Sequence, residues 1–112
     1  MSENIDNEDT TSSSTDTTEL LNEFKKRNHI FHDSENDSLN LILNKSQAAI
    51  KRLTGTDDLS NPEVAELVLE RSRYVYNDAL EYFEENFQST ILGVSVENYQ
   101  PKEGDSDGSN GL

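Results

Sequence analysis

The sequence predicts an all-α protein, a small helical bundle with a short helix, a medium helix and one long central helix. An extended C-terminal segment and acidic, disordered-like tails are expected around it. Apolar residues recur at helical spacing in three stretches, and helix start and stop signals bound these stretches. Large apolar residues are scarce before Leu20 and after Tyr99. The foldable part is therefore about 80 residues, a size at which contacts with other chains add usefully to a modest core.

Composition divides the chain into four parts. Residues 1–18 form an acidic, low-complexity tail with five acidic residues and no Lys or Arg. We expect residues 19–88 to form the helical domain, residues 89–100 an extended docking segment, and residues 101–112 a polar tail. A segment as polar as the first tail buries too little apolar surface to offset the entropy cost of ordering it, so we predict that it is disordered in isolation.

The stretch from Ser60 to Phe87 has the strongest helical signal. Ser60 and Glu63 match a capping box, and Pro62 falls in the first turn, where a missing N–H costs nothing. No Gly or Pro follows before Gly93, so we expect one continuous helix. Its apolar face carries Val64, Val68, Val75, Ala79, Phe83 and Phe87.

A second ridge lies beyond that apolar face. Leu67, Arg71 and Tyr74 recur at positions i, i+4 and i+7 and so share one side of the helix. Leu41 lies on the side of the medium helix that is opposite its apolar stripe. These four residues are our candidates for contacts between subunits.

Two shorter helices precede the long one. Residues 16–28 start with a plausible capping box and end with three basic residues, which suit the negative end of a helix dipole. Residues 38–53 carry a clean apolar stripe, and Gly55 is placed to end that helix in the left-handed conformation.

The loop between these two helices contains both apolar and potential metal-binding residues. We expect Ile30 and Phe31 to tuck under the helices. His29, His32 and Asp33 have a spacing that is not a helical i, i+4 pair, and no third ligand group is evident beside them. We therefore predict structural or exposed histidines and no metal site.

The pattern changes after Phe87. The sequence QSTILGVSVENYQ holds β-branched residues, a glycine and an alternation of valines, which is typical of a short strand. This chain offers no second strand, so the partner would be another chain. The alternative is that the first apolar residues cap the core and the rest frays. Our candidate docking residues are Leu92, Val94, Val96 and Tyr99.

Charge and composition exclude several functions. A net charge of −14 argues against gripping nucleic acid or an anionic membrane, because phosphate binding needs clusters of Lys and Arg. The absence of cysteine excludes disulfides and thiol chemistry. No apolar run reaches membrane-spanning length and no signal peptide is present, so we expect a cytosolic origin. No catalytic motif or phosphate loop occurs, so we predict no enzyme activity and no cofactor.

Three blocks of the sequence resemble the small head–tail connector proteins of tailed bacteriophages, also called adaptor or head-completion proteins. The blocks read LLNEFKKRNHIFHD, SLNLILNKSQAAIKRLTG and ELVLERSRYVYNDALEYFEENFQSTIL. The resemblance covers about Leu20 to Val96 and lies in the order, length and pattern of the elements. The acidic leader before Leu20 is not part of this pattern.

The resemblance implies a structural role in the virion. Such proteins assemble into a ring, usually a dodecamer, beneath the portal after DNA packaging. The ring extends the DNA channel and offers a docking surface for a stopper or tail-completion protein. The implied partners are the portal protein, the stopper or tail and further copies of the chain, while DNA passes without specific binding. Assembly in the host cytoplasm would leave the protein in the virion neck, with the residues around Leu92 to Tyr99 at the portal.

A second hypothesis belongs to a different class. The acidity is compatible with a cytosolic regulator or DNA mimic that occupies a nucleic-acid-binding enzyme. Such a protein needs its acidic residues on an ordered surface. Here five of the 23 acidic residues lie in the first 18 residues, which favours the connector hypothesis.

Overall fold

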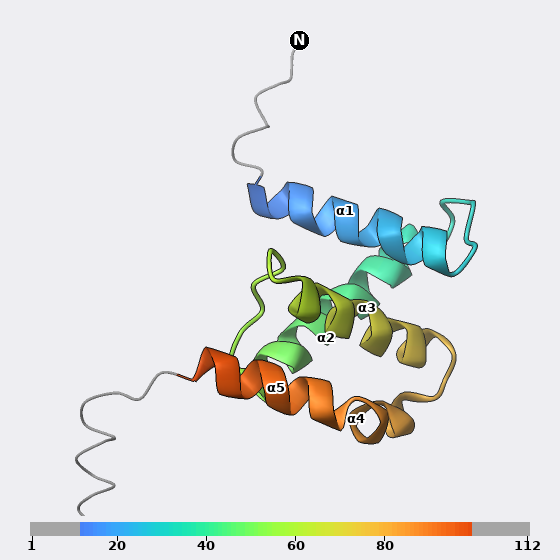
Figure 1. Cartoon of the computed structure of the whole chain (residues 1–112). Helices are drawn as coiled ribbons and strands as arrows, with labels where there is room; N and C mark the ends of the chain where they lie inside the picture. Colours follow the sequence, from blue (N-terminus) through green and yellow to red (C-terminus); the bar gives the residue numbers. More distant parts are fainter. Residues whose placement is uncertain (1–11, 100–112) are drawn as a thin grey trace, which may run out of the picture.

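A computed structural model describes residues 12–99 and shows a helical protein (Figure 1). The elements are α1 (Ser12–Arg27), α2 (Asn36–Thr54), α3 (Pro62–Tyr76), the short 3₁₀ helix η3 (Leu80–Tyr82), α4 (Phe83–Asn86) and α5 (Gln88–Asn98). No strand occurs within residues 12–99. The predicted all-α helical bundle is confirmed.

Helices α2 and α3 form the centre of the molecule. They pack against each other, and both also contact α1 and α5. Helix α1 lies on one side of the central pair and α5 on the other, with α4 leading into α5 (Figure 1). The core therefore lies on two sides of the central helix pair, covered by α1 on one side and by α5 on the other.

The core draws apolar side chains from every α-helix of the described chain. Phe24 and Phe83 are the largest fully buried side chains. The other core residues are Leu20, Leu21, Ile30, Leu39, Leu43, Ala49, Ile50, Val64, Leu67, Val68, Leu69 and Val94. Two buried serines, Ser46 and Ser72, have hydrogen-bond partners: Ser72 Oγ donates to the Val68 carbonyl at 2.8 Å, and Ser46 Oγ accepts from Arg71 at 3.1 Å.

The predicted continuous helix over residues 60–87 is wrong, because the helix ends at Tyr76. Asp78 adopts the left-handed conformation with φ of 59°, and the Ala79 N–H donates to the Tyr74 carbonyl at 2.8 Å. This hydrogen bond closes a Schellman motif, the usual way to end a helix. Glycine usually occupies the left-handed position, but Asn and Asp tolerate it better than other residues do. The chain then turns back through η3 and α4.

Helix α1 ends in the same type of motif. His29 is left-handed with φ of 57°. An asparagine precedes the left-handed residue in both places, and each asparagine side chain donates to the carbonyl four residues earlier. The Asn28–Phe24 and Asn77–Arg73 distances are both 2.9 Å. Each of these carbonyl groups also accepts from the backbone N–H of the same asparagine, so the side-chain amide adds a second hydrogen bond at the helix end.

The start of α3 differs from the predicted capping box. Asn61 is the N-cap, and its Oδ1 accepts from the Glu63 N–H at 2.9 Å. Ser60 instead donates its hydroxyl to Asp58 at 2.7 Å. Pro62 occupies the first turn as predicted, where its missing N–H leaves no bond unmade.

The two ends of the described chain are more helical than predicted. Helix α1 begins at Ser12, four residues before the predicted start of the first helix at residue 16, and residues 1–11 lie outside the described chain. Once a helix is nucleated, each added residue gains a hydrogen bond, which favours extension beyond the packed part. The extended conformation predicted for residues 89–100 is also wrong, because residues 88–98 form α5. The polar tail, residues 101–112, lies outside the described chain.

The loop before α2 buries only one of its two large apolar residues. Ile30 is in the core, as predicted, but Phe31 is 83% exposed, so its predicted burial is wrong. The left-handed turn at His29 directs the next residue inward. The rest of the loop stays at the surface, where Lys25 Nζ donates to Asp33 at 2.8 Å and to Asn36 at 2.7 Å. Gly55 ends α2 with φ of 90°, which confirms the predicted left-handed cap.

Replacement of Phe83 by alanine tests the packing of the C-terminal half. Phe83→Ala should lower the free energy of unfolding by about 3–5 kcal/mol, because it removes a fully buried ring. The neighbouring Tyr82→Ala is the control, since Tyr82 is 55% exposed and should cost less than about 1 kcal/mol. Urea unfolding followed by circular dichroism measures both, and equal losses would contradict this packing.

Candidate docking surface on helix α5

Helix α5 has one buried and one exposed apolar side. Val94 is 1% exposed and faces the core. Leu92, Val96 and Tyr99 are 61%, 65% and 65% exposed and follow the spacing i, i+4 and i+7. We call these three residues the α5 stripe. Exposed large apolar residues that align in this way are typical of an interaction surface.

The sequence alternation that suggested a strand has a helical explanation. Val94 and Val96 are two residues apart, which would place them on one face of a strand. In the helix they lie on nearly opposite sides, with Val94 against the core and Val96 exposed. Burial of Val94 and Ile91 outweighs the modest helix preference of β-branched residues. Val94 is therefore a core residue, and its predicted docking role is wrong.

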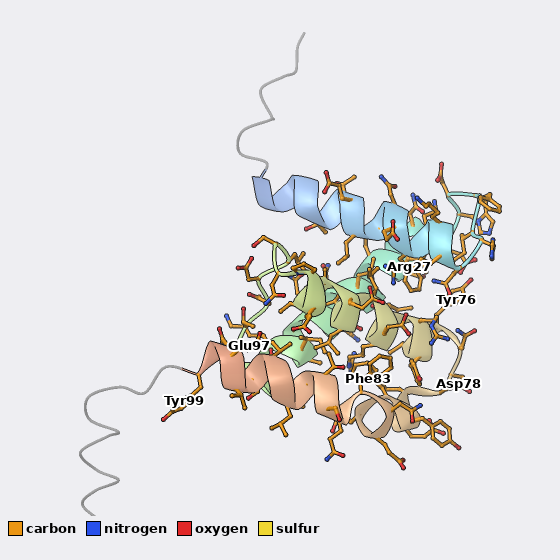
Figure 2. The ribbon with its side chains drawn as sticks, viewed as in Figure 1. Arg27, Tyr76, Asp78, Phe83, Glu97 and Tyr99 are labelled. Atoms are coloured by element: carbon orange, nitrogen blue, oxygen red, sulfur yellow. The ribbon has the colours of Figure 1, made fainter. Side chains whose placement is uncertain are left out.

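An aromatic cluster holds the start of α5. The rings of Phe83 and Phe87 stack with their centroids 5.0 Å apart, and Tyr74 meets both edge-on at 5.7 and 5.8 Å. Figure 2 shows the Phe83 side chain between α3 and the α4–α5 segment. Edge-to-face and offset contacts of this kind add to the stabilisation from burial.

The end of α5 rests on the end of α2. Asn98 Nδ2 donates to the Thr54 carbonyl at 3.5 Å, and a Cβ atom added to Gly55 would lie 2.9 Å from the same Asn98 nitrogen. Glycine at position 55 thus serves both the left-handed cap and this close approach. Because α5 is held at both ends, Tyr99 extends from a fixed helix and points away from the helical body (Figure 2).

A groove of about 460 Å³ borders the α5 stripe, and we call it the α5 groove. Its lining includes Leu53 of α2, Glu84 and Glu85 of α4, and Ile91, Leu92 and Ser95 of α5. Leu92 belongs to both the stripe and the groove. Sequence reasoning missed this groove, since Leu53 of α2 adjoins α4 and α5 in space only after the chain has turned back at Asp78.

Most of the predicted subunit ridge lies inside the subunit. Leu67 is 1% exposed and belongs to the core, so its predicted role at an interface is wrong. Helix α3 is central and is covered by other helices on both sides, which buries an arc wider than a surface helix would use. Tyr74 is half-buried in the aromatic cluster, while Leu41 is 55% exposed on α2.

The side chain of Arg71 also makes its contacts within the subunit. Its Nη1 donates to Ser46 Oγ at 3.1 Å, and its side chain is half-buried. Burial lowers the pKa of Arg71, the positive charge of Arg52 lowers it further, and Glu84 acts in the opposite direction. Guanidinium groups nevertheless stay protonated in proteins. Arg71 therefore places a fixed positive charge between α2 and the rim of the α5 groove.

The exposed face of α2 is basic. Leu41, Lys45, Ala48 and Arg52 are exposed and follow one another at helical spacing. Neither Lys45 nor Arg52 has an ion-pair partner within residues 12–99. Three acidic side chains of α1 and α3 are instead paired elsewhere: Arg27 contacts Glu23 at 2.8 Å and Glu66 at 3.0 Å, and Arg73 contacts Glu70 at 2.7 Å.

The histidine loop is organised by contacts within the chain. The His29 ring meets Phe31 edge-on at 6.2 Å, and His32 lies 3.5 Å from Glu35. The Lys25 ammonium donates to Asp33 and lowers the pKa of that carboxyl group. Within the described residues, no three His, Asp or Glu side chains come together as a metal site. No helix in residues 12–99 is long and apolar enough to cross a membrane.

A small helical bundle that holds exposed apolar residues on one helix face has a surface typical of proteins that bind other proteins. Comparison with known families agrees with this class, because the family model for the phage gp6-like head-tail connector protein matches residues 18–111. The protein belongs to this family. It is a structural connector of a bacteriophage with a role in virion assembly, as the resemblance predicted. No curated protein and no solved structure matches the chain.

The placement of Tyr74 can be tested by two substitutions. Tyr74→Ala should lower the free energy of unfolding by on the order of 2 kcal/mol, because it removes the ring that meets both phenylalanines. Tyr74→Phe keeps these contacts and loses only the hydrogen bond from Asn86 to the exposed hydroxyl, so it should cost less than about 1 kcal/mol. Tyr74→Ala with unchanged unfolding but impaired self-assembly would instead make Tyr74 an interface residue.

Proposed function

We propose that this connector forms a ring beneath the portal, extends the DNA channel and provides the docking surface for the stopper or tail. The observation that carries the proposal is the α5 stripe. Leu92 and Val96 of α5, with Tyr99 directly after the helix, form an exposed apolar row that the core already holds in place. A partner that covers this row gains apolar burial without having to order the helix first.

The portal is the partner that we assign to the α5 stripe. An amphipathic helix whose exposed anchors recur at i, i+4 and i+7 fits a groove or a flat apolar patch on another protein. Only side chains of α5 need to enter the portal surface, because the opposite side of the helix is packed on the core through Val94. The rest of the bundle then remains free to contact neighbouring copies and the tail.

The outer face of α2 is our candidate for contacts between copies. Leu41 provides an exposed apolar anchor, and Lys45 and Arg52 add positive charge in a chain with a net charge of −14. This face is complementary to acidic surfaces elsewhere on the next copy. A contact between two different surfaces of the same chain closes into a ring when the rotation between copies allows it, and we propose twelve copies as the closed assembly.

The overall acidity suits a wall along which DNA moves. Phosphate groups are bound by clusters of Lys and Arg, and the described acidic side chains outnumber the basic ones. DNA would therefore slide past without specific binding. Assembly would take place in the host cytoplasm, and the finished protein would remain in the neck of the virion.

Substitution of Val96 tests the assignment to the portal. Val96→Asp places a charge in the middle of the α5 stripe and should weaken binding to the portal protein of the same phage at least about tenfold, because burial of an unpaired charge is costly. Helicity should not change, since Val96 is 65% exposed. Asn22→Asp on α1, also at an exposed position, makes the same change in charge and should bind normally. Wild-type affinity of Val96→Asp would overturn the assignment.

Substitution of Leu41 tests the contact between copies. Leu41→Asp should lower the mass of the assembly formed on the portal, as measured by native mass spectrometry, because it removes an apolar anchor and adds a charge. Asn22→Asp again serves as the control. A full-sized assembly with Leu41→Asp would mean that another face of the subunit forms the ring.

A further inference from the structure

We infer that the α5 groove receives a Lys or Arg side chain of the portal, presented beside the apolar residues that cover the α5 stripe. This inference rests on the proposed docking of α5 at the portal and adds the chemistry of the partner segment. In this inference, contacts with the α5 stripe provide most of the binding affinity, and the α5 groove determines which partner binds.

The groove continues the docking surface. Leu92 lies on the stripe and lines the groove, so a segment seated on the stripe reaches the groove without leaving the protein. The half-buried side chains of Leu53 and Ile91 provide apolar lining. A volume of about 460 Å³ is within the range of clefts that hold bound groups.

The charge of the rim sets the charge of the occupant. Glu84 and Glu85 are exposed, and neither has an ion-pair partner within residues 12–99, although Arg71 acts on Glu84 from beyond ion-pairing distance. A long basic side chain fits both parts of the groove, because its methylene stem packs on apolar lining while its charged end reaches the carboxylates. A neutral apolar segment would contact only the apolar lining. It would exclude water from beside the two carboxylates without giving them a partner.

The tails of this chain are poor candidates for the same groove. Residues 1–11 contain four acidic residues and no Lys or Arg, and residues 100–112 contain three acidic residues and one lysine. Both would bring negative charge to a negative rim. A partner that carries a basic residue avoids this repulsion, and charges placed at the edge of an interface mainly determine which partner binds and how fast.

The test neutralises the rim without changing its shape. Glu84→Gln/Glu85→Gln should weaken binding to the purified portal about 2- to 30-fold, the range expected for the loss of two partly exposed charge contacts. The affinity of the wild-type protein should fall as salt rises from about 50 to 500 mM, and the double variant should lose much of that dependence. Glu19→Gln/Glu63→Gln removes the same charge at two exposed positions on α1 and α3, away from α5 and the groove, and should behave as wild type.

The outcomes separate this inference from the proposed function. If Val96→Asp abolishes portal binding while Glu84→Gln/Glu85→Gln matches its control at every salt concentration, the groove inference is overturned and docking by α5 stands. If the glutamine variant alters self-association in the absence of portal and leaves portal binding unchanged, the groove belongs to a second copy and the inference is again overturned. If the wild-type protein does not bind the portal, the proposed function itself fails.

Discussion

Burial of the Phe83 ring beneath Tyr74 and Phe87 is the contact on which the C-terminal half of this protein depends. In an unbroken helix, Phe83 would lie about 10 Å beyond Tyr76 along the helix axis, too far from the core to pack. The left-handed turn at Asp78 reverses the chain and brings the ring back against α3. Two backbone hydrogen bonds of the Schellman motif and the burial of an aromatic ring together stabilise this reversal.

The position of α5 follows from that reversal. With Phe83 and Phe87 fixed, the helix that follows runs back along α2. Val94 enters the core, and Asn98 reaches the end of α2 at Thr54. The opposite side of α5 then has no neighbour within the described chain, so Leu92 and Val96 remain exposed. The docking surface is thus a geometric consequence of the core, and changes that loosen the aromatic cluster should also displace the stripe.

Much of the architecture could be predicted from the sequence, and the errors share a cause. Periodicity identified α1, α2 and α3, and Gly55 and Pro62 marked ends that the structure confirms. The break at Asp78 was missed because it uses Asn-Asp without glycine or proline, the residues on which the prediction of helix ends relied. An extended segment was predicted in place of α5 because the two alternating valines span too few residues to distinguish the period of a strand from that of a helix.

The errors in the candidate sites follow from the errors in the fold. Leu67 was expected at a surface because the long helix was treated as having only one packed side, whereas α3 is covered on two sides. Leu92, Val96 and Tyr99 were identified on a segment that was expected to be extended, yet they also follow helical spacing along α5 and its C-cap, so they remain one exposed set. The groove beside them depends on a contact between α2, α4 and α5 that no local sequence pattern encodes.

Amide hydrogen exchange in the free protein tests the central claim that α5 is a folded, outward-facing docking helix before any partner binds. The account predicts that amides of residues 91–98 exchange with protection comparable to those of α2 and α3, because the aromatic cluster and Val94 hold the helix on the core. Exchange of these amides at the rate of an unstructured chain, with protection gained only when portal is added, would contradict it.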